Sequence, residues 1–491
     1  MIEEISRRDI ADLRQFLVAN DYSAAGLAER LGISEPPRSD GTASLFHATR
    51  ATTPLNALVR LFLAGASLEE ALLREALPGP FLDMCLHTGL LNKQDDRIAA
   101  AITIVPVEDL LFASDAYQLL GAENANEFIL PAHTRAASFL RHMTMRTPVE
   151  LTLDLGCGCG VQALFAARHS QRVIATDINP AALRYTEFNA QLNNIENVEC
   201  RLGDLFEPVA DERFDLILSN PPFVIGPKSE FIYRDNPLQL DEFSRQIVRA
   251  APARLKDGGH MQMLCEWLTI TGEQWHTRLD AWFDDIDCDA WVLRSPPKRP
   301  TEYATMRLAD ISGGALSQAT DFGEWLGYFE RNSVAAVNAG MIVLRRREGD
   351  NWFHAHGIAH EPQSDAGDEV QASLAAADFA DLCCDDETML QAHLGIPASL
   401  QLEQRFDRHA DGWDSGMAIL RLKGALGIQL EIDLPVLAFV NRIDGKRSVE
   451  ECIAAFCKAT GADPAGLTPE LLPVVRLLAQ NGFLEPVEAD T

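Results

Sequence analysis

Between residue 150 and about residue 347 the sequence alternates between short apolar runs and helical patterns, and no other feature constrains the fold as strongly. Residues 151–156, 172–178 and 214–220 have the composition of strands, and the intervening residues 161–169 and 180–194 have helical spacing. Parallel strands need crossover connections of this kind, because a tight turn cannot place two strands side by side in the same direction. The alternation therefore predicts an α/β domain built on a mostly parallel sheet.

The sequence patterns divide the chain into three parts. Residues 1–115 are mainly helical and end in a short β-ribbon, which indicates a winged-helix-like module; a helical cap over the next domain fits equally well. Residues 116–347 contain the α/β pattern. Residues 348–491 begin acidic and irregular and continue with two strand-like runs. Their last part, about 433–488, is helical and resembles the small winged-helix modules with a DGKRSVEE…GFL type of pattern found in peptide-modifying systems.

The formal net charge of −30 is concentrated toward the C-terminal end. Residues 1–150 carry 13 basic and 20 acidic side chains, residues 151–347 carry 20 and 27, and residues 348–491 carry 9 and 25. Nucleic-acid binding relies on clustered Lys and Arg, so this balance disfavours a nucleic-acid partner, although a local basic patch would still permit one.

Three further observations concern the cellular compartment. No apolar run is long enough for a transmembrane helix, and the N-terminus lacks the apolar core of a signal peptide. The ten cysteines show no metal-type CxxC spacing. We therefore expect a reduced, cytoplasmic protein without membrane association.

A glycine-rich loop follows the first expected strand. The stretch LDLGCGCG places Asp154, Gly156, Gly158 and Gly160 between a strand and a helix, where glycine lets the backbone pass close to a ligand. Asp177 comes 23 residues after Asp154, at the end of the second strand, where a carboxylate can hold ribose hydroxyls. This layout suits either a dinucleotide or S-adenosylmethionine, and the glycine pattern alone does not decide between them.

A rigid polar corner ends the fourth expected strand. Asn220-Pro221-Pro222-Phe223 follows the apolar run 214–219, and the two prolines cannot extend a central strand because they lack a backbone N–H. Ligands in open α/β sheets bind outside the carboxyl ends of the strands. We therefore expect this corner to face a ligand.

The glycine loop, the acid and the corner together resemble class I S-adenosylmethionine-dependent methyltransferases, and in particular the amino-methylating group with an Asn-Pro-Pro-aromatic motif. The resemblance covers about residues 125–270. It implies a Rossmann-like fold with a seven-stranded, mostly parallel sheet, and S-adenosylmethionine as the cofactor.

The same resemblance implies a set of cofactor contacts. Asp177 would hold the ribose hydroxyls with Ile178 against the adenine, Asp204 would take the adenine amino group, and Leu205 or Phe206 would cover the ring. The positions carried over for the cofactor are Asp154, Gly156, Cys157, Gly158, Gly160, Asp177, Ile178, Asp204, Leu205 and Asn220.

The corner itself predicts the chemistry. A planar amide or amine nitrogen is a poor nucleophile, because its lone pair is delocalised. The Asn220 side-chain oxygen and the Pro221 carbonyl would accept its two N–H groups and support the positive charge that builds during methyl transfer. Pro222 would help to stiffen the corner, and Phe223 would stack on the planar group.

These features predict an enzyme, an N-methyltransferase that acts on a protein or peptide side chain such as a glutamine amide. The alternatives are an exocyclic base amine of ribosomal or transfer RNA, a small-molecule amine, or a non-catalytic cofactor-binding protein. FILPAHT resembles a loop of protein glutamine methyltransferases and indicates Pro131 and Thr134 as neighbours of the cofactor or substrate. Tyr233-Arg234-Asp235 would either cover the substrate or form a surface ion-pair cluster. The sequence does not indicate the oligomeric state.

Two weaker features remain. His354, His356 and His360 could be a metal cluster, but nearby ligands are lacking and we expect no metal site. The basic run 345–347 is expected to be a solvated strand end, with phosphate contact as the alternative.

Overall fold

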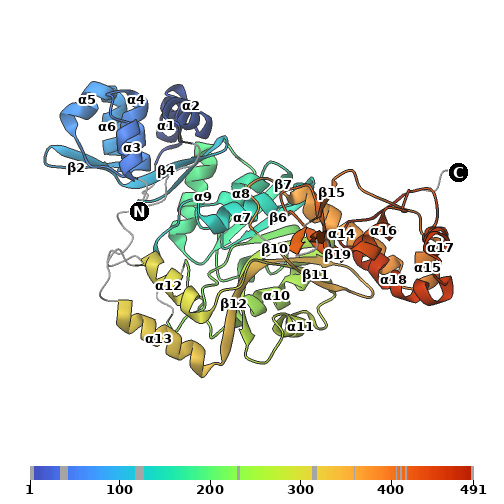
Figure 1. Ribbon diagram of the computed structural model, residues 1–491. Coiled ribbons are helices and arrows are strands. Elements are labelled where there is room, and N and C mark those ends of the chain that lie inside the picture. Colours follow the sequence, from blue (N-terminus) through green and yellow to red (C-terminus); the bar gives the residue numbers. More distant parts are fainter. Residues whose placement is uncertain are drawn as a thin grey trace. The chain divides into compact units, whose positions relative to one another are not determined.

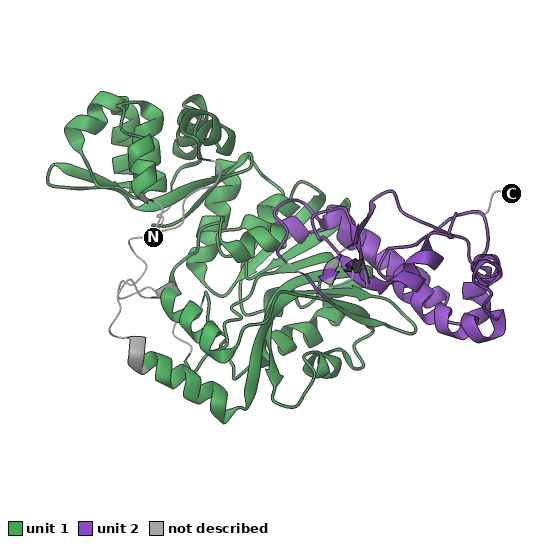
Figure 2. Cartoon of the chain, in the orientation of Figure 1, with its two compact units in different colours: residues 1–141, 147–356 green, residues 142–146, 357–491 purple. Residues whose placement is uncertain are grey.

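The computed structural model describes residues 5–33, 42–116, 127–228, 233–311, 318–358, 360–404, 406–409, 412–414 and 417–487. The outer ends of the expected terminal modules, residues 1–4 and 488–491, lie outside the described residues. The chain forms two compact units, which comprise residues 1–141 with 147–356, and residues 142–146 with 357–491 (Figure 2).

A central sheet dominates the first unit. Its strands are β6 (Val149–Leu155), β7 (Ser170–Asp177), β8 (Val198–Leu202), β9 (Phe214–Ser219), β10 (Leu255–Ile270), β11 (Cys288–Arg294), β12 (Val334–Arg346) and β13 (Phe353–Gly357). They lie in the order β13-β11-β12-β10-β9-β6-β7-β8. The five strands from β10 to β8 pair in parallel, and β12 lies antiparallel between β10 and β11. The sheet thus has eight described strands where seven were expected, because β13 adds an edge strand from beyond residue 347.

The strand order creates a switch point between β6 and β9. The chain leaves β6 toward β7 and β8, and it leaves β9 in the opposite direction, toward β10. This is the Rossmann-like arrangement, in which a ligand binds in the crevice between two connections that diverge. The glycine loop follows β6 and the Asn-Pro-Pro corner follows β9, so the topology brings the two motifs together.

Helices cover both faces of this sheet. They are α7 (Arg135–Met143), α8 (Val161–Ala166), α9 (Pro180–Leu192), η4 (Glu207–Val209), α10 (Glu242–Ala250), η5 (Ala251–Arg254), α11 (Thr277–Phe283), α12 (Pro300–Ile311) and α13 (Gln318–Arg331). Helices α8 and α9 pack on one face, and α10 and α11 pack on the other (Figure 1). Strand β7 shows the alternation: Val173 and Ala175 join the first apolar cluster and Ile174 joins the second. Asn179 caps α9, since its side chain accepts the N–H of Ala181, and Pro180 is the first residue of the helix.

The N-terminal part of this unit is helical with two small antiparallel sheets. Its elements are α1 (Arg7–Ala19), α2 (Ala24–Leu31), α3 (Thr42–Ala48), α4 (Pro54–Leu58), η1 (Val59–Leu63), β1 (Leu68–Glu69), α5 (Glu70–Ala76), α6 (Gly79–His87), β2 (Leu91–Gln94), β3 (Arg97–Ala100), β4 (Ile102–Val107) and β5 (Leu110–Asp115). The expected β-ribbon is present as the hairpin β2–β3, and β1 pairs with β3. Residues of this part and of α8, α9 and β7 belong to one continuous hydrophobic cluster.

The second unit has a separate hydrophobic cluster. Its elements are α14 (Gly367–Leu382), α15 (Asp386–Gln391), β14 (Leu394–Gly395), β15 (Leu400–Gln404), β16 (Asp407–His409), β17 (Gly412–Asp414), β18 (Met417–Leu422), β19 (Gln429–Asp433), α16 (Leu434–Val440), α17 (Val449–Thr460), α18 (Pro464–Gln480) and β20 (Glu485–Pro486). The two expected strand runs are β18 and β19, and the helical end is α16 to α18. The expectation of irregular structure is wrong for the stretch that forms α14.

Within the described ranges, no helix combines the length and apolar character that crossing a bilayer requires.

Candidate functional site

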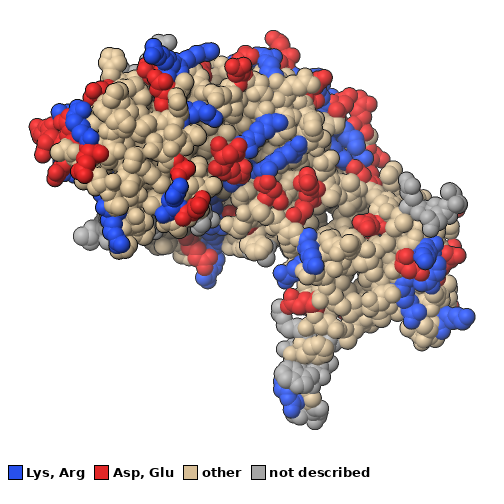
Figure 3. All heavy atoms as spheres, turned by 90° about the horizontal axis from the view of Figure 1, so that it is seen from above, with Lys and Arg blue, Asp and Glu red and all other residues tan. Residues whose placement is uncertain are grey.

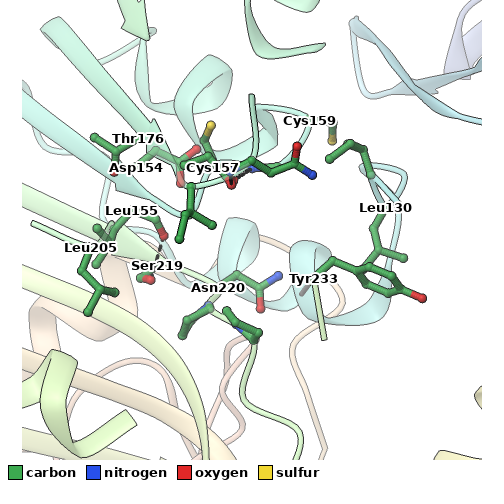
Figure 4. A pocket seen from close by; sticks show the side chains of 18 of the residues that line it. Leu130, Asp154, Leu155, Cys157, Cys159, Thr176, Leu205, Ser219, Asn220 and Tyr233 are labelled. Carbon is green, nitrogen blue, oxygen red and sulfur yellow. Dashed lines mark hydrogen bonds between the residues drawn. The ribbon is translucent and has the colours of Figure 1, made fainter. Parts of the chain in front are cut away.

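A cavity of about 590 Å³ opens at the carboxyl ends of β6, β7, β8 and β9. It lies at the switch point, where the topology places a ligand. The predicted residues that line it are Pro131, Thr134, Asp154, Gly156, Cys157, Gly158, Asp177, Ile178, Asp204, Leu205, Asn220, Pro221, Pro222 and Tyr233. Residues nominated from distant parts of the sequence thus line one cavity (Figure 4).

The glycine loop is held to the end of β7 by backbone hydrogen bonds. The N–H groups of Gly156 and Cys157 both donate to the carbonyl of Thr176 at 2.9 Å. Gly156 and Gly158 have φ angles of +77° and +54°, a region that disfavours residues with a Cβ. A Cβ at either position would meet no protein atom within 4 Å. These two positions therefore leave open space beside the backbone, which a ligand could occupy.

Gly160 has a different role from the one expected. It lies outside the cavity lining, at the N-terminus of α8, with φ +79°. A Cβ there would come within 2.8 Å of Thr186 Cγ2. Gly160 is required for close packing of the loop against α9, so the expectation of a direct cofactor contact is not met.

Asp177 is held in place by the loop that it faces. Its Oδ2 accepts the N–H of Gly158 at 3.0 Å, and its Oδ1 accepts the N–H of Asn179 at 2.8 Å. Burial raises the pKa of this carboxyl, while the backbone hydrogen bonds act in the opposite direction. Each carboxylate oxygen has a further lone pair, so the pair of oxygens can still accept two hydroxyl groups.

Asp154 lies deeper, at the end of β6, and is 1% exposed. Its Oδ2 accepts the N–H of Ala163 in the first turn of α8 at 2.8 Å. Burial, and to a smaller extent the charge of Asp177, raise the pKa of Asp154 to about 7. A cation in the cavity would stabilise the ionised form of this group.

The thiols of the loop are not poised for nucleophilic chemistry. Burial raises the pKa of Cys159 to about 12 and raises that of Cys157 well above its usual value. Both side chains stay protonated at neutral pH and act as small buried groups.

The turn after β8 forms a second wall. Gly203, Asp204 and Leu205 line the cavity, and Leu205 has φ +45°, which is uncommon for a residue with a Cβ. Residues held in such conformations are often found at ligand sites. Ile178 is 56% exposed and lies on the same side of the cavity as an apolar surface.

The corner after β9 presents its first three residues to the cavity. Asn220, Pro221 and Pro222 belong to the lining, and the Asn220 carboxamide lies between the strand ends that carry Leu155 and Ser219 and the ring of Tyr233 (Figure 4). Ser219 holds the two strand ends together, since its hydroxyl donates to the carbonyl of Leu155 at 2.9 Å.

Phe223 departs from the expectation. It lies outside the cavity lining and packs against the apolar cluster that contains Ile225, Tyr303 and Trp325. The next residue, Val224, forms a β-bridge with Asp235. The packing of Phe223 in that cluster helps to anchor the corner, and the stacking of Phe223 on a substrate stays a prediction.

A buried network lies behind the corner. The N–H of Ile225 donates to Tyr303 Oη at 3.1 Å, and Tyr303 Oη in turn donates to Glu266. Arg307 pairs with the same carboxylate at 2.5 Å. Tyr303 and Glu266 are 1% and 2% exposed. The network fixes the backbone that follows the Asn-Pro-Pro corner.

The segment after the corner lines the cavity in part. Tyr233 and Asp235 belong to the lining, whereas Arg234 does not and donates from Nε to Asp235 Oδ1 at 2.7 Å. The Arg234–Asp235 pair is largely buried and is not a surface cluster, Arg234 lies outside the cavity lining, and the covering of a substrate by this segment stays a prediction.

Sequence reasoning missed several lining residues. Phe128, Ile129 and Leu130 belong to the FILPAHT stretch, of which only two residues were selected, and Phe243 and Gln246 come from α10. Helix α10 was not predicted, although the apolar residues at 243, 247 and 248 have helical spacing.

The two weaker features have structural roles. His354 stacks on Trp352 with centroids 4.6 Å apart, and His356 accepts a hydrogen bond from Trp291 Nε1 at 2.8 Å. Among the residues that the structure describes, no group of three or more His, Cys, Asp or Glu is arranged to hold a metal ion.

The basic run at the end of β12 is not a solvated strand end, which corrects that expectation. Asp289 is fully buried, and its carboxylate pairs with Arg345 at 2.6 Å and with Arg347 at 3.0 Å. On the face drawn in Figure 3, Lys and Arg side chains are interspersed with Asp and Glu.

Comparison with known proteins adds independent evidence. Residues 134–273 match the family model described as Methyltransferase small domain. Residues 19–101 and 374–486 match two models described as domains of unknown function, DUF7059 and DUF7782.

Three curated relatives match the middle of the chain. A release factor glutamine methyltransferase of Cereibacter sphaeroides is 39% identical over 129 residues, which are 23% of this chain and 46% of that protein. A ribosomal protein uL3 glutamine methyltransferase of Bradyrhizobium diazoefficiens is 36% identical over 148 residues, 27% and 44% of the two chains. A ribosomal RNA small subunit methyltransferase C of Alcanivorax borkumensis is 29% identical over 133 residues, 27% and 35% of the two.

These matches confirm that the middle of the chain resembles class I N-methyltransferases, and they indicate S-adenosylmethionine as the cofactor of this domain. The chain spans less than half the length of each of these relatives.

Proposed function

We propose that this protein transfers a methyl group from S-adenosylmethionine to a planar side-chain nitrogen of a protein or peptide, of the glutamine-amide kind. One observation carries the proposal: the glycine loop with Asp177 and the corner Asn220-Pro221-Pro222 line the same cavity. A nitrogen held by the corner would therefore meet a methyl group held by the loop.

The residues of the cavity suit this cofactor. Gly156 and Gly158 leave open space beside the loop, and Asp177 retains lone pairs for the two ribose hydroxyls. The Thr176 hydroxyl is buried in the lining and has no hydrogen-bond partner among the described residues, which leaves it available to a ligand. Asp154 and Asp177 supply negative charge toward a cationic ligand.

The corner orients the nucleophile. When bound, S-adenosylmethionine supplies a methyl group already activated on a sulfonium. The Asn220 side-chain oxygen and the Pro221 carbonyl accept the two N–H groups of the planar nitrogen, which turns its lone pair toward the methyl carbon. As the N–C bond forms, the C–S bond breaks and its electron pair stays on sulfur, so that S-adenosylhomocysteine leaves. The nitrogen then loses one proton, which passes through its hydrogen-bond acceptors to water.

A protein substrate fits the chain better than RNA. The relatives with the highest identity named above are glutamine methyltransferases, and the net charge of −30 disfavours binding to phosphate backbones. The second candidate is an exocyclic base amine in ribosomal RNA, which the resemblance to the ribosomal RNA methyltransferase favours.

The flanking parts would select the substrate. We treat residues 1–115, 116–347 and 348–491 as the functional divisions of the chain, with winged-helix-like modules at both ends. Two observations support the N-terminal module: the element order α5, α6, β2, β3 and the sheet order β1-β3-β2. For residues about 433–488, α16 to α18 and the short strand β20 support the same interpretation.

Incubation of the purified protein with lysate and methyl-labelled S-adenosylmethionine tests this function. We expect label in macromolecules that protease releases and nuclease does not. Asn220→Ala should reduce the incorporation at least roughly hundredfold, because one of two fixed acceptors is lost, and should leave the affinity for S-adenosylhomocysteine nearly unchanged. Nuclease-sensitive label would favour the RNA candidate, and wild-type incorporation by Asn220→Ala would refute the role of the corner.

A further inference from the structure

Helix α9 contacts two structures at once, the glycine loop and strand β5 of the N-terminal part. Asn189 on this helix is fully buried. Its Oδ1 accepts the N–H of Ala113 at 2.7 Å, and its Nδ2 donates to the carbonyl of Ala113 at 2.9 Å. The same Nδ2 donates to the carbonyl of Cys159 in the glycine loop at 2.8 Å. One side-chain amide thus joins the edge of β5 to the loop.

Two residues near Asn189 each contact one of these two structures: Asn193, the C-cap of α9, contacts β5, and Thr186 on α9 contacts the glycine loop. Asn193 pairs with the N–H and the carbonyl of Leu111 at 2.9 and 2.7 Å, and its other hydrogen bond goes to the Asn189 carbonyl. Thr186 donates to the carbonyl of Gly158 at 3.2 Å and contacts Cys157 Sγ at 3.3 Å. Asn193 therefore holds β5 by hydrogen bonds, and Thr186 holds the glycine loop.

Strand β5 also reaches the cavity at its end. Tyr185 Oη donates to Asp115 Oδ1 at 2.6 Å, and Asp115 Oδ2 accepts the N–H of Ile129 at 2.9 Å. Ile129 lines the cavity. The last residue of β5 thus holds a residue of the cavity wall in place.

We propose that Asn189 is a positioning residue through which strand β5 of the N-terminal part and the glycine loop stabilise each other, so that cofactor binding and the ordering of β5 are coupled. If the loop moved alone, the buried Asn189 amide would lose the Cys159 carbonyl. If Asn189 moved with the loop, the N–H and the carbonyl of Ala113 would lose their side-chain partner. Unsatisfied buried polar groups are costly. Coupling of this kind is reciprocal, so a ligand on the loop must also stabilise β5. The inference rests on the proposed function only in its use of the cofactor as the ligand.

Hydrogen exchange of the full-length wild-type protein, with and without saturating S-adenosylhomocysteine, tests the coupling without any variant. We expect the ligand to slow exchange of the Leu111 and Ala113 amides roughly fivefold or more. Binding of the ligand by calorimetry without protection of these amides would overturn this inference alone. Absence of binding would overturn the proposed function and this inference with it.

Three variants separate the roles along α9. Asn189→Ala should weaken the affinity for S-adenosylhomocysteine roughly tenfold and abolish the protection of β5. Asn193→Ala is the matched control, because it removes the equivalent pairing with β5 and leaves the loop untouched; its affinity should stay within about twofold of wild type. Thr186→Val should weaken the affinity for S-adenosylhomocysteine. Hydrogen exchange of the β5 amides in the free protein should stay unchanged in this variant. Equal affinities of Asn189→Ala and Asn193→Ala would contradict the proposal.

Discussion

Asp154 is a buried acid whose titration can be observed directly. Its raised pKa of about 7, against 3.8 when unfolded, means that the folded state binds a proton that the unfolded state releases between about pH 4 and pH 7. The stability contributed by the protonated form is present below about pH 4 and is lost as the pH rises to about 7. We predict that Asp154→Asn removes this loss, so that from about pH 4 to pH 7 the wild type loses stability relative to the variant, by up to roughly 4 kcal/mol.

The measurement is chemical denaturation at several pH values, with Asp204→Asn in the turn after β8 as the control. Asp154→Asn keeps an oxygen for the N–H of Ala163, so the start of α8 should stay capped. Parallel pH profiles of wild type and Asp154→Asn would show that Asp154 titrates normally.

Two glycines of the loop should respond differently to the same substitution. Gly158→Ala places a methyl group in open space of the cavity lining, and Gly160→Ala drives one into Thr186. In both variants the positive φ angle strains the new alanine, which lowers the free energy of unfolding by about 1 kcal/mol. We predict that Gly158→Ala mainly lowers the affinity for S-adenosylhomocysteine and that Gly160→Ala mainly lowers the melting temperature. Thermal melts and calorimetry check this, and an equal loss of stability in both variants would contradict it.

At the level of residues, sequence reasoning found the polar groups better than the apolar ones. Asp177 and Asn220 could be predicted because their chemistry and their order after strands restrict their roles. The packing of Phe223 could not, because the apolar cluster that it joins includes Tyr303 and Trp325, which are distant in the sequence. Gly158 and Gly160 cannot be told apart in the sequence, because both belong to the same glycine-rich motif. Only the packing of Thr186 against Gly160 distinguishes them.

Helix α12 should control the geometry of the corner after β9 through Tyr303. Tyr303 Oη accepts the N–H of Ile225 and donates to Glu266, and both contacts are buried. We predict that Tyr303→Phe lowers the rate of methyl transfer roughly tenfold and leaves the affinity for S-adenosylhomocysteine unchanged, because the glycine loop is not touched.

Tyr328→Phe is the matched control for this change. Its hydroxyl accepts the N–H of Leu240 at 3.0 Å and is not part of the network behind the corner. Single-turnover transfer to the labelled acceptor and calorimetry give the two readouts. A decrease in transfer that is equal in both variants would mean that Tyr303 has only a general structural role.

At the level of elements, the strands of the α/β part were predictable because buried parallel strands are continuous apolar runs. Helix α14 was missed because Asp368 and Glu369 were assigned to an acidic, irregular stretch. These residues form the first turn of the helix, where acidic side chains are favourable. Strand β13 was not predicted as part of the sheet, because it is short, only partly buried and lies beyond the expected end of the α/β part at residue 347.

The chain as a whole has separate hydrophobic clusters in its two units, and the N-terminal part shares a cluster with the α/β part. Parts of the chain that share a hydrophobic cluster should unfold together, and parts with separate clusters can unfold separately. We predict two calorimetric transitions, of which S-adenosylhomocysteine raises only the one that belongs to the first unit, because ligands stabilise the state that binds them. A single transition that shifts as a whole would contradict this division.

The division of the sequence into three parts stays a prediction, and the sequence could not define how these parts contact one another. The pairing of Asn189 and Asn193 with β5 depends on residues more than 70 positions apart, so neither motif nor periodicity reveals it. The sequence indicated the FILPAHT stretch through Pro131 and Thr134, and the structure adds that residues 128–130 of the same stretch also line the cavity.

Calorimetric titration of the full-length protein with S-adenosylhomocysteine tests the central claim most directly, that the cavity between the glycine loop and the Asn-Pro-Pro corner holds the cofactor. The account predicts saturable binding at one site per chain, weakened at least roughly tenfold by Asp177→Ala and retained by Asn220→Ala. No binding by the wild type, or equal binding by wild type and Asp177→Ala, would contradict it.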